Sequence, residues 1–225
     1  DPLWSRGLGD VYKRQELERQ LEKNPWIKKA DIYFDNQQIL HVDIMQKNPV
    51  ARVFTPDGNS FYLDNQFGLL PLKTTDHIVL PVFTNYYINP GGMNKVDSAV
   101  TSRVVGLSQF ILNDPFWLAQ VESVYIRPDN SFELTTQVGE HTIDLGDRSD
   151  WEPMFNKLKL MYKKFNAEQS WGRYSKINLQ FKDQVVCERS GIQMMVADST
   201  ILDSTPSIQT LLKTSINNSI NPSKK

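Results

Sequence analysis

The sequence has one cysteine, Cys187, and no long run of apolar residues. A single cysteine excludes an intrachain disulfide and any multi-cysteine metal site. A membrane-spanning helix needs about 18 or more consecutive apolar residues, so none is expected within these 225 residues. These absences exclude disulfide-stabilised scaffolds and zinc ribbons. They are compatible with a reducing compartment or with an envelope protein that uses no disulfides.

Motifs for catalysis and nucleotide binding are also missing. The sequence contains no GxGxxG, no P-loop lysine motif, no HExxH and no GxSxG. Its formal net charge of −1 and its pI near 6.4 give no sign of the basic patch that nucleic-acid binding requires. We therefore expect a protein that is not an enzyme, with no cofactor, no small-molecule substrate and no nucleic-acid partner.

The remaining candidates for chemistry are few. The three histidines lie far apart in the sequence, on or beside predicted strands, and are expected to be exposed strand residues. Cys187 has no nearby histidine and is expected to be a buried structural thiol. The carboxylates Asp144, Asp147 and Asp150 could support acid–base work in an envelope hydrolase. The same residues are also typical of a strand end, a glycine turn and a helix N-cap.

Local patterns predict an α+β fold. Apolar residues recur with a helical period over 97–112 and over 151–165, the second helix following Asp150 as N-cap. A third helix is expected to end near residue 24, before Pro25. Alternating or β-branched runs predict strands over these ranges: 26–35, 39–47, 60–63, 69–72, 78–84, 121–127, 132–137, 141–145, 175–181 and 184–189.

Both ends of the sequence differ from the middle. Residues 5–15, SRGLGDVYKRQ, resemble the in-frame translation of a sequencing adaptor. We therefore expect residues 1–15 to be a non-native artefact, with the natural protein continuing upstream. Residues 190–225 are rich in Ser, Thr, Asn and Ile and are expected to form a flexible polar tail.

The strand predicted over 184–189 is the last of the chain and could form the edge of a sheet. An edge strand offers unpaired N–H and C=O groups to a strand of another protein. The alternative is that the tail or another strand covers it.

The order of several motifs resembles the FtsQ/DivIB family of cell-division proteins. QLEKNPWIKKADIYFDNQQILHVDIMQKNPVAR is similar to the second half of the family's POTRA domain. FYLDNQFGLLPL resembles the Asp-x-x-Gly-x-x-x-Pro entry to its second domain, and LPVFTN resembles a following strand, with Asn85 where glycine is usual. YSKINLQFKDQVVCER resembles the terminal hairpin.

This resemblance implies a truncated POTRA domain over 16–55 and an FtsQ-type β domain over 56–189, mainly antiparallel and flanked by two helices. It implies a non-enzymatic scaffold of the divisome, held in the inner membrane by an N-terminal helix missing here, with this fragment on the periplasmic side at the septum. FtsB/DivIC-like and FtsL-like proteins would be the partners, together with other septal membrane proteins. A POTRA module of outer-membrane assembly or transport is the alternative.

The resemblance also implies a partner site. It comprises an apolar anchor, an edge strand and a cation on a neighbouring strand: Phe181, Val185, Val186, Cys187, Glu188, Arg189 and Arg127. The family's tyrosine and tryptophan in this region are replaced here by Phe181 and Arg189. Phe181 could equally be a core residue of the closing hairpin.

Overall fold

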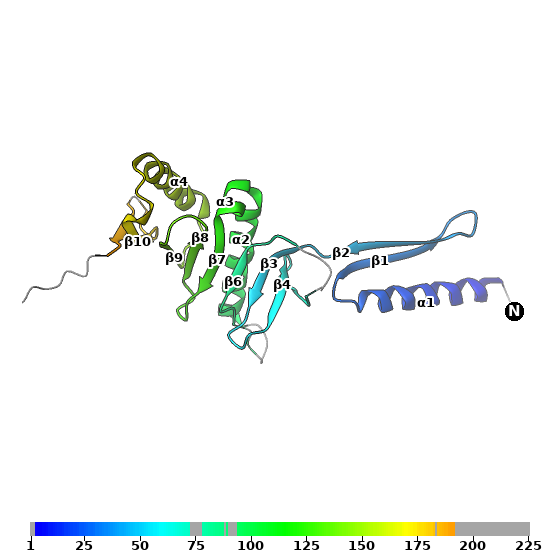
Figure 1. Cartoon of the computed structure of the whole chain (residues 1–225). Coiled ribbons are helices and arrows are strands. Elements are labelled where there is room, and N and C mark those ends of the chain that lie inside the picture. The colour runs from blue at the N-terminus through cyan, green and yellow to red at the C-terminus, as the bar shows by residue number, and fades with distance from the viewer. Residues whose placement is uncertain (1–2, 73–77, 88, 90–93, 183, 192–225) are drawn as a thin grey trace, which may run out of the picture. The chain divides into compact units, whose positions relative to one another are not determined.

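The computed structural model describes residues 3–72, 78–87, 89, 94–182 and 184–191 (Figure 1). His77 and almost all of the predicted polar tail lie outside these residues. The predicted tail therefore stays a prediction.

The chain begins with a helix and a β-hairpin, as the sequence predicts for residues 16–47. α1 spans Leu3–Glu22, β1 spans Ile27–Phe34, and β2 spans Leu40–Gln46. The two strands pair antiparallel and form a sheet of their own. α1 runs without a break through residues 3–15, and the adaptor interpretation of that segment stays a prediction.

The other nine strands form one mixed sheet in the order β11-β10-β9-β8-β7-β6-β3-β4-β5. Five of its pairings are antiparallel, so the sheet is mainly antiparallel as expected, but the pairings β3–β6, β6–β7 and β9–β10 are parallel and make it a mixed sheet. The strands are β3 Pro49–Phe54, β4 Ser60–Asp64, β5 Leu69–Leu70, β6 Val82–Thr84, β7 Val121–Ile126, β8 Phe132–Thr136, β9 Thr142–Gly146, β10 Tyr174–Asn178 and β11 Val186–Arg189. Because β3 belongs to this sheet, the large sheet begins before the predicted domain boundary at residues 55 and 56.

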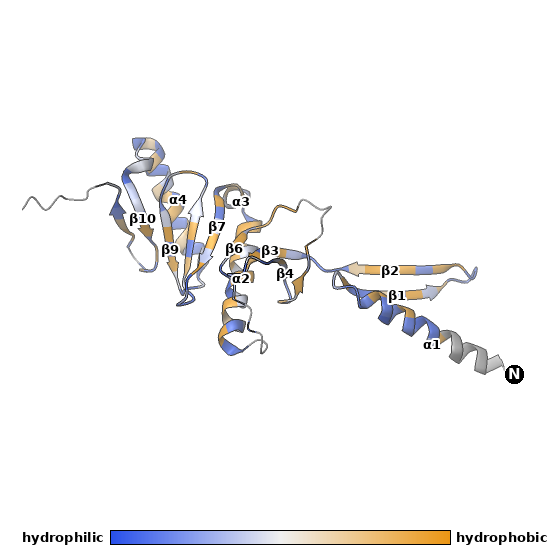
Figure 2. Ribbon diagram, turned by 60° about the horizontal axis from the view of Figure 1, so that its bottom comes forward, coloured by the Kyte–Doolittle hydropathy of each residue, from blue (hydrophilic) through white to orange (hydrophobic). Residues whose placement is uncertain are grey.

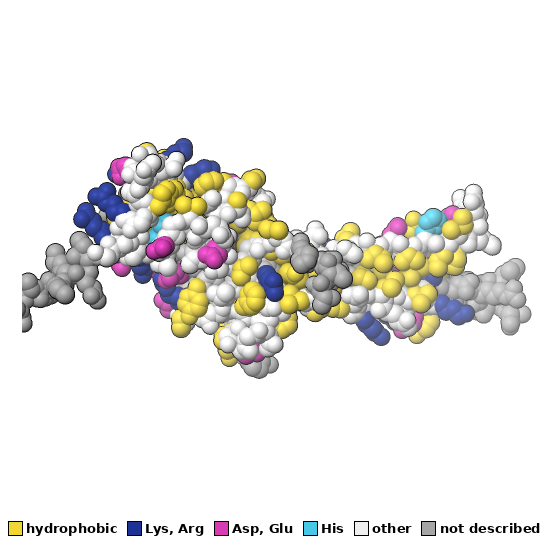
Figure 3. Space-filling model, viewed as in Figure 1, with side chains coloured by type: hydrophobic (Ala, Val, Ile, Leu, Met, Phe, Trp, Pro, Cys, Tyr) yellow, Lys and Arg dark blue, Asp and Glu magenta, His cyan; other side chains and the backbone are white. Residues whose placement is uncertain are grey.

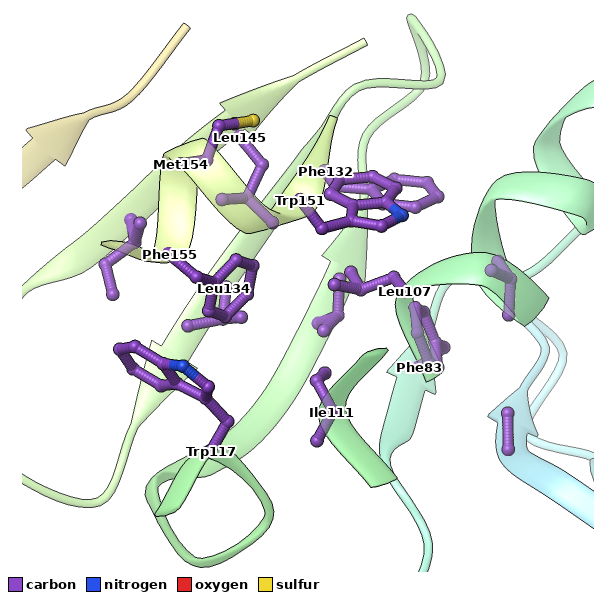
Figure 4. Close-up of a cluster of buried hydrophobic side chains, with 14 of the residues drawn as sticks. Phe83, Leu107, Ile111, Trp117, Phe132, Leu134, Leu145, Trp151, Met154 and Phe155 are labelled. Atoms are coloured by element: carbon purple, nitrogen blue, oxygen red, sulfur yellow. The ribbon is translucent and has the colours of Figure 1, made fainter. Parts of the chain in front are cut away.

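Three helices contribute to the core of this sheet. They are α2 (Lys95–Asn113), α3 (Pro115–Gln120) and α4 (Trp151–Glu168), and a 3₁₀ turn, η1 (Trp171–Arg173), precedes β10. The sequence predicts α2 and α4 but not α3. Leu134 of β8 and Leu145 of β9 are fully buried in the same core cluster as residues of these helices (Figure 4).

The two long helices begin differently. The Asn94 side-chain oxygen accepts hydrogen bonds from the N–H groups of Val96 and Asp97. The Asp97 carboxylate in turn accepts one from the Asn94 N–H, which completes a capping box for α2. Asp150 occupies the predicted N-cap position of α4 but makes no capping hydrogen bond. Its carboxylate is held by the Arg148 guanidinium instead.

The turn between β4 and β5 carries Asp64 and Gly68 of the FYLDNQFGLLPL segment, which are spaced Asp-x-x-x-Gly, one residue wider than the family's Asp-x-x-Gly. Asp64 is almost completely buried, and its Oδ1 accepts hydrogen bonds from the N–H groups of Gln66 and Gly68 at 2.8 and 2.7 Å. A Cβ on Gly68 would lie only 2.7 Å from the same carboxylate. The Asp64 carboxylate therefore stabilises the turn through these hydrogen bonds, and the close approach of its oxygen requires glycine at position 68.

Replacing Asp64 by alanine is expected to lower the free energy of unfolding by about 1–2 kcal/mol, because the N–H groups of Gln66 and Gly68 lose their shared acceptor. Asp64→Asn keeps an oxygen at this position and should cost less. Urea denaturation at pH 7 measures both. Equal losses for the two variants would contradict the role of Oδ1.

Candidate functional site: the β10–β11 edge

β11 lies at one end of the nine-stranded sheet, as the sequence predicts. It pairs antiparallel with β10, with Ile177 opposite Cys187 and Asn178 opposite Val186. Among the residues that the structure describes, no strand pairs with its other side. Within the described part of the chain, the outer side of β11 is therefore a sheet edge, and the alternative that the tail covers it concerns residues outside that part.

The register shows which backbone groups of β11 face outward. The Leu179 N–H donates to the Asp144 carbonyl at 2.9 Å, so alternate residues of β10, including Ile177, turn their backbone groups toward β9. Asn178 and Lys176 then turn theirs toward β11. Because Cys187 lies opposite Ile177, the Cys187 N–H and C=O point away from β10, toward the open edge.

The side chains around this edge divide into two groups. Val185 and Cys187 are half-buried and pack against the core, and burial raises the pKa of the Cys187 thiol. Val186, Glu188 and Arg189 are exposed. The Cys187 side chain thus points toward the core, while its backbone N–H and C=O point toward the open edge. The thiol is half-buried and not fully buried as predicted.

Phe181 lies in the loop between β10 and β11, where its ring is 45% exposed. The exposure excludes the interpretation that this ring is a core residue of the hairpin. The loop itself is held by Lys157 of α4, whose Nζ donates to the carbonyls of Phe181 (2.6 Å), Lys182 (3.3 Å) and Leu179 (3.4 Å). Lys157 is a positioning residue that sequence reasoning missed, since only the fold brings it to the loop.

Arg127 does not belong to this edge. It follows β7, and three strands (β8, β9 and β10) separate β7 from β11. Its guanidinium is ion-paired with Glu133 and, at 3.0 Å, with Asp144. The expectation that Arg127 pairs a carboxylate of the partner beside β11 thus has no geometric support.

Asp144 is the centre of a buried polar network. Its carboxylate accepts from Gln180 Nε2 at 2.8 Å and lies 3.3 Å from Lys176 Nζ, in addition to the Arg127 pair. Burial alone would raise its pKa, but the hydrogen bonds from Gln180 and Arg127 and the Arg127 charge outweigh burial and lower the pKa. The carboxylate therefore holds its negative charge and is poorly suited to act as a general acid.

The other two carboxylates of the predicted cluster do not join Asp144. Asp147 and Asp150 are exposed, and Asp150 is tied to Arg148. Cavities of about 350 and 270 Å³ lie near Tyr86 and near Trp171, and none of the three carboxylates lines either one. This arrangement gives no support to the hydrolase alternative.

His141 is buried, in contrast to the prediction that it is exposed. Its Nε2 lies 3.0 Å from the Tyr162 hydroxyl, and burial lowers the pKa of the imidazole. The Tyr162 hydroxyl also lies 2.9 Å from Thr136 Oγ1, and burial raises the Tyr162 pKa to about 12. His141 is thus part of the core beneath α4.

Neither a metal-binding cluster nor a membrane-spanning helix is found among the described residues. No cluster of three or more His, Cys, Asp or Glu side chains that could hold a metal ion occurs among them. None of their helices combines the length and the apolar character that crossing a membrane requires.

Comparison with known protein families relates this chain to one of them. No curated protein matches the chain. The family model described as "FtsQ/DivIB, C-terminal related" matches residues 48–188, which begin just before β3 and end within β11. The match covers the whole nine-stranded sheet except its last residue, and more than half of the sequence. The chain belongs to the FtsQ/DivIB C-terminal-related family, and is therefore related to proteins of bacterial cell division.

Proposed function

We propose that this protein is a non-enzymatic scaffold of the bacterial divisome that binds its partners by strand addition to β11. The observation that carries the proposal is the open edge of β11 within the part of the chain that the family model matches. An added strand would accept a hydrogen bond from the outward N–H of Cys187 and donate one to its outward C=O. FtsB/DivIC-like and FtsL-like proteins are the proposed partners.

Side chains at the edge supply the remaining contacts. Phe181 and Val186 are each about half exposed. Their apolar side chains offer an anchor for the partner beside the strand. Glu188 and Arg189 are exposed at its end and would set register by charge. Since Arg127 is held by Glu133 and Asp144, we omit it from the proposed contacts.

The cellular setting is part of the same proposal. The family match supports a division protein with an extracytoplasmic β domain, and it favours this function over a module of outer-membrane assembly. The helix and hairpin before residue 48 would be the second half of a POTRA domain. A membrane helix N-terminal to this sequence would hold the protein in the inner membrane at the septum, beside other septal membrane proteins.

Replacing Cys187 by proline is expected to weaken partner binding by about tenfold or more, because proline removes the outward N–H that an added strand would use. Proline at this position removes no bond to β10, since the lost N–H points away from it. The partner is the extracytoplasmic segment of the FtsB/DivIC-like protein of the same genome. Isothermal titration calorimetry measures the dissociation constant.

Cys187→Ala is the matched control, because it loses the same thiol but keeps the N–H. It should bind like the parent, and all three proteins should give the same circular dichroism spectrum. Equal binding by the proline and alanine variants would rule out β11 as the site of strand addition. No binding by the parent protein would count against the proposed partner itself.

A further inference from the structure

The outward face of α4 is basic. Hydrophilic and hydrophobic residues follow one another along this helix (Figure 2), and Lys159, Lys163 and Lys164 are not among its buried residues. Its glutamates, Glu152 and Glu168, stand at the two ends of the helix. Figure 3 shows Lys and Arg side chains gathered over α4. The middle of the helix surface therefore carries positive charge.

The cavity of about 270 Å³ near Trp171 adjoins this basic face, and we call it the α3–α4 cavity. Its apolar walls come from four separate elements: Phe116 (α3), Val138 (the turn between β8 and β9), Tyr162 (α4) and Trp171 (η1). Since about 150 Å³ is enough to hold a benzene molecule, the cavity has room for one aromatic side chain.

The Tyr162 ring is a fixed part of the wall. It is almost completely buried, and its hydroxyl lies 2.9 Å from Thr136 Oγ1 and 3.0 Å from His141 Nε2. The Trp171 ring lies edge-on to it, with 5.1 Å between the two centroids. These contacts hold the wall in place before any ligand arrives, so binding requires little further ordering of the protein.

The rim of the cavity is cationic. Lys159 and Lys163 both line it, and no carboxylate lines it among the described residues. The Lys159 ammonium lies 5.0 Å from the centroid of the Phe116 ring and 3.7 Å from the Asp114 carboxylate. Lys163 is exposed and pairs with no carboxylate in the described part of the chain. The apolar walls thus end in positive charge that is only partly neutralised.

We propose that the α3–α4 cavity binds an acidic peptide segment of another protein, which inserts an aromatic side chain between the apolar walls. Aromatic rings pack edge-on or offset against other rings, and Phe116, Tyr162 and Trp171 offer such contacts. Carboxylates beside the inserted residue pair with the ammonium groups of Lys159 and Lys163. Charge complementarity selects an acidic partner, because a basic peptide brings like charges together at the rim.

The proposal is independent of strand addition, because no residue of β11 lines this cavity. The test uses the full chain and the peptide acetyl-Glu-Asp-Phe-Asp-Glu-amide at low salt, followed by ¹H–¹⁵N correlation spectra. The signals of Val138 and Trp171 should shift and saturate with added peptide, whereas those of β11 should not. Peptides with alanine in place of phenylalanine, or with lysine in place of the acidic residues, should bind at least about fivefold more weakly.

Two neighbouring lysines supply matched variants. Lys163→Glu turns an attraction at the rim into a repulsion and should raise the dissociation constant of the acidic peptide by about fivefold. Lys164→Glu makes the same change of net charge on the next residue, which does not line the cavity, and should stay near the parent value. Both side chains are exposed, so both variants should keep the circular dichroism spectrum of the parent.

Three results would overturn the proposal. One is the absence of saturable shifts in the parent protein at about 5 mM peptide, a concentration that detects even millimolar affinity. Another is an equal loss of affinity in the two variants, which would assign the binding to net charge alone. The third is a set of shifts confined to β11, which would place the peptide at the sheet edge and leave the α3–α4 cavity without a ligand.

Discussion

Replacement of Trp117 by alanine is expected to lower the free energy of unfolding by about 3–5 kcal/mol. The Trp117 side chain is 2% exposed and lies edge-on to the Phe155 ring, with 4.8 Å between their centroids (Figure 4). It also contacts the Tyr162 ring at 6.1 Å, so it joins α3 to α4. Its removal leaves a cavity among large rings that cannot easily close. Urea denaturation followed by circular dichroism measures the loss.

Phe116→Ala is the neighbouring control for this prediction. The Phe116 ring contacts Trp117 as closely, at 4.8 Å, but it is 37% exposed. Its loss should therefore cost about 1 kcal/mol, the ordinary effect of a substitution outside the core. Equal losses for the two variants would mean that α3 contributes to stability through its surface and not through the buried indole.

The elements with strong local patterns were predictable. In α2 the residues Val104, Leu107 and Ile111 are buried at a helical spacing, as the sequence indicates. The strands β7, β8 and β9 follow one another through short turns, so their antiparallel pairing needs only neighbouring segments. In such elements, periodicity along the chain and burial in the fold report the same property.

The remaining features depend on segments far apart in the sequence. The parallel pairing of β6 with both β3 and β7 joins strands that no turn connects, so no local pattern encodes it. α3 has only six residues, too few to show a helical period. His141 is buried because Tyr162 of α4 lies above it, and a strand pattern alone cannot show which face a helix will cover.

The same distinction applies to the candidate site. The edge position of β11 among the described strands agrees with the sequence prediction for the last hairpin, whose two strands adjoin in sequence and pair with each other. The position of Arg127 was not predictable, since it requires the order of five strands across the sheet. Arg127 instead pairs with the buried carboxylate of Asp144, and the loss of that carboxylate is the second large effect.

Replacement of Asp144 by asparagine is expected to lower the free energy of unfolding at pH 7 by about 2–3 kcal/mol. The variant keeps the shape of the side chain but leaves Arg127 with Glu133 alone and Lys176 without its carboxylate. The Asp144 carboxylate is almost fully buried, so solvent cannot replace the lost charge. Urea denaturation of both proteins at several pH values measures the difference.

The size of this difference should depend on pH in a defined direction. The pKa of Asp144 is lower in the folded protein than its ordinary value of about 3.9 in an unfolded chain. The unfolded chain therefore takes up the proton first as the pH falls, and the stabilisation by the charged form is complete above about pH 5 and is lost progressively below pH 4. The gap between parent and Asp144→Asn should consequently narrow toward pH 3.

Asp150→Asn provides the comparison that isolates burial. Asp150 also pairs with an arginine, Arg148, but its side chain is 41% exposed, so solvent screens the pair and the stability difference should be small at every pH. A gap for Asp144→Asn that stays constant from pH 7 to pH 3 would show that the carboxylate acts through shape and hydrogen bonding alone. A stability difference that disappears in acid would show that the charge of Asp144 stabilises the fold. That charge pairs β9 with Arg127, which follows β7, and with Lys176 of β10.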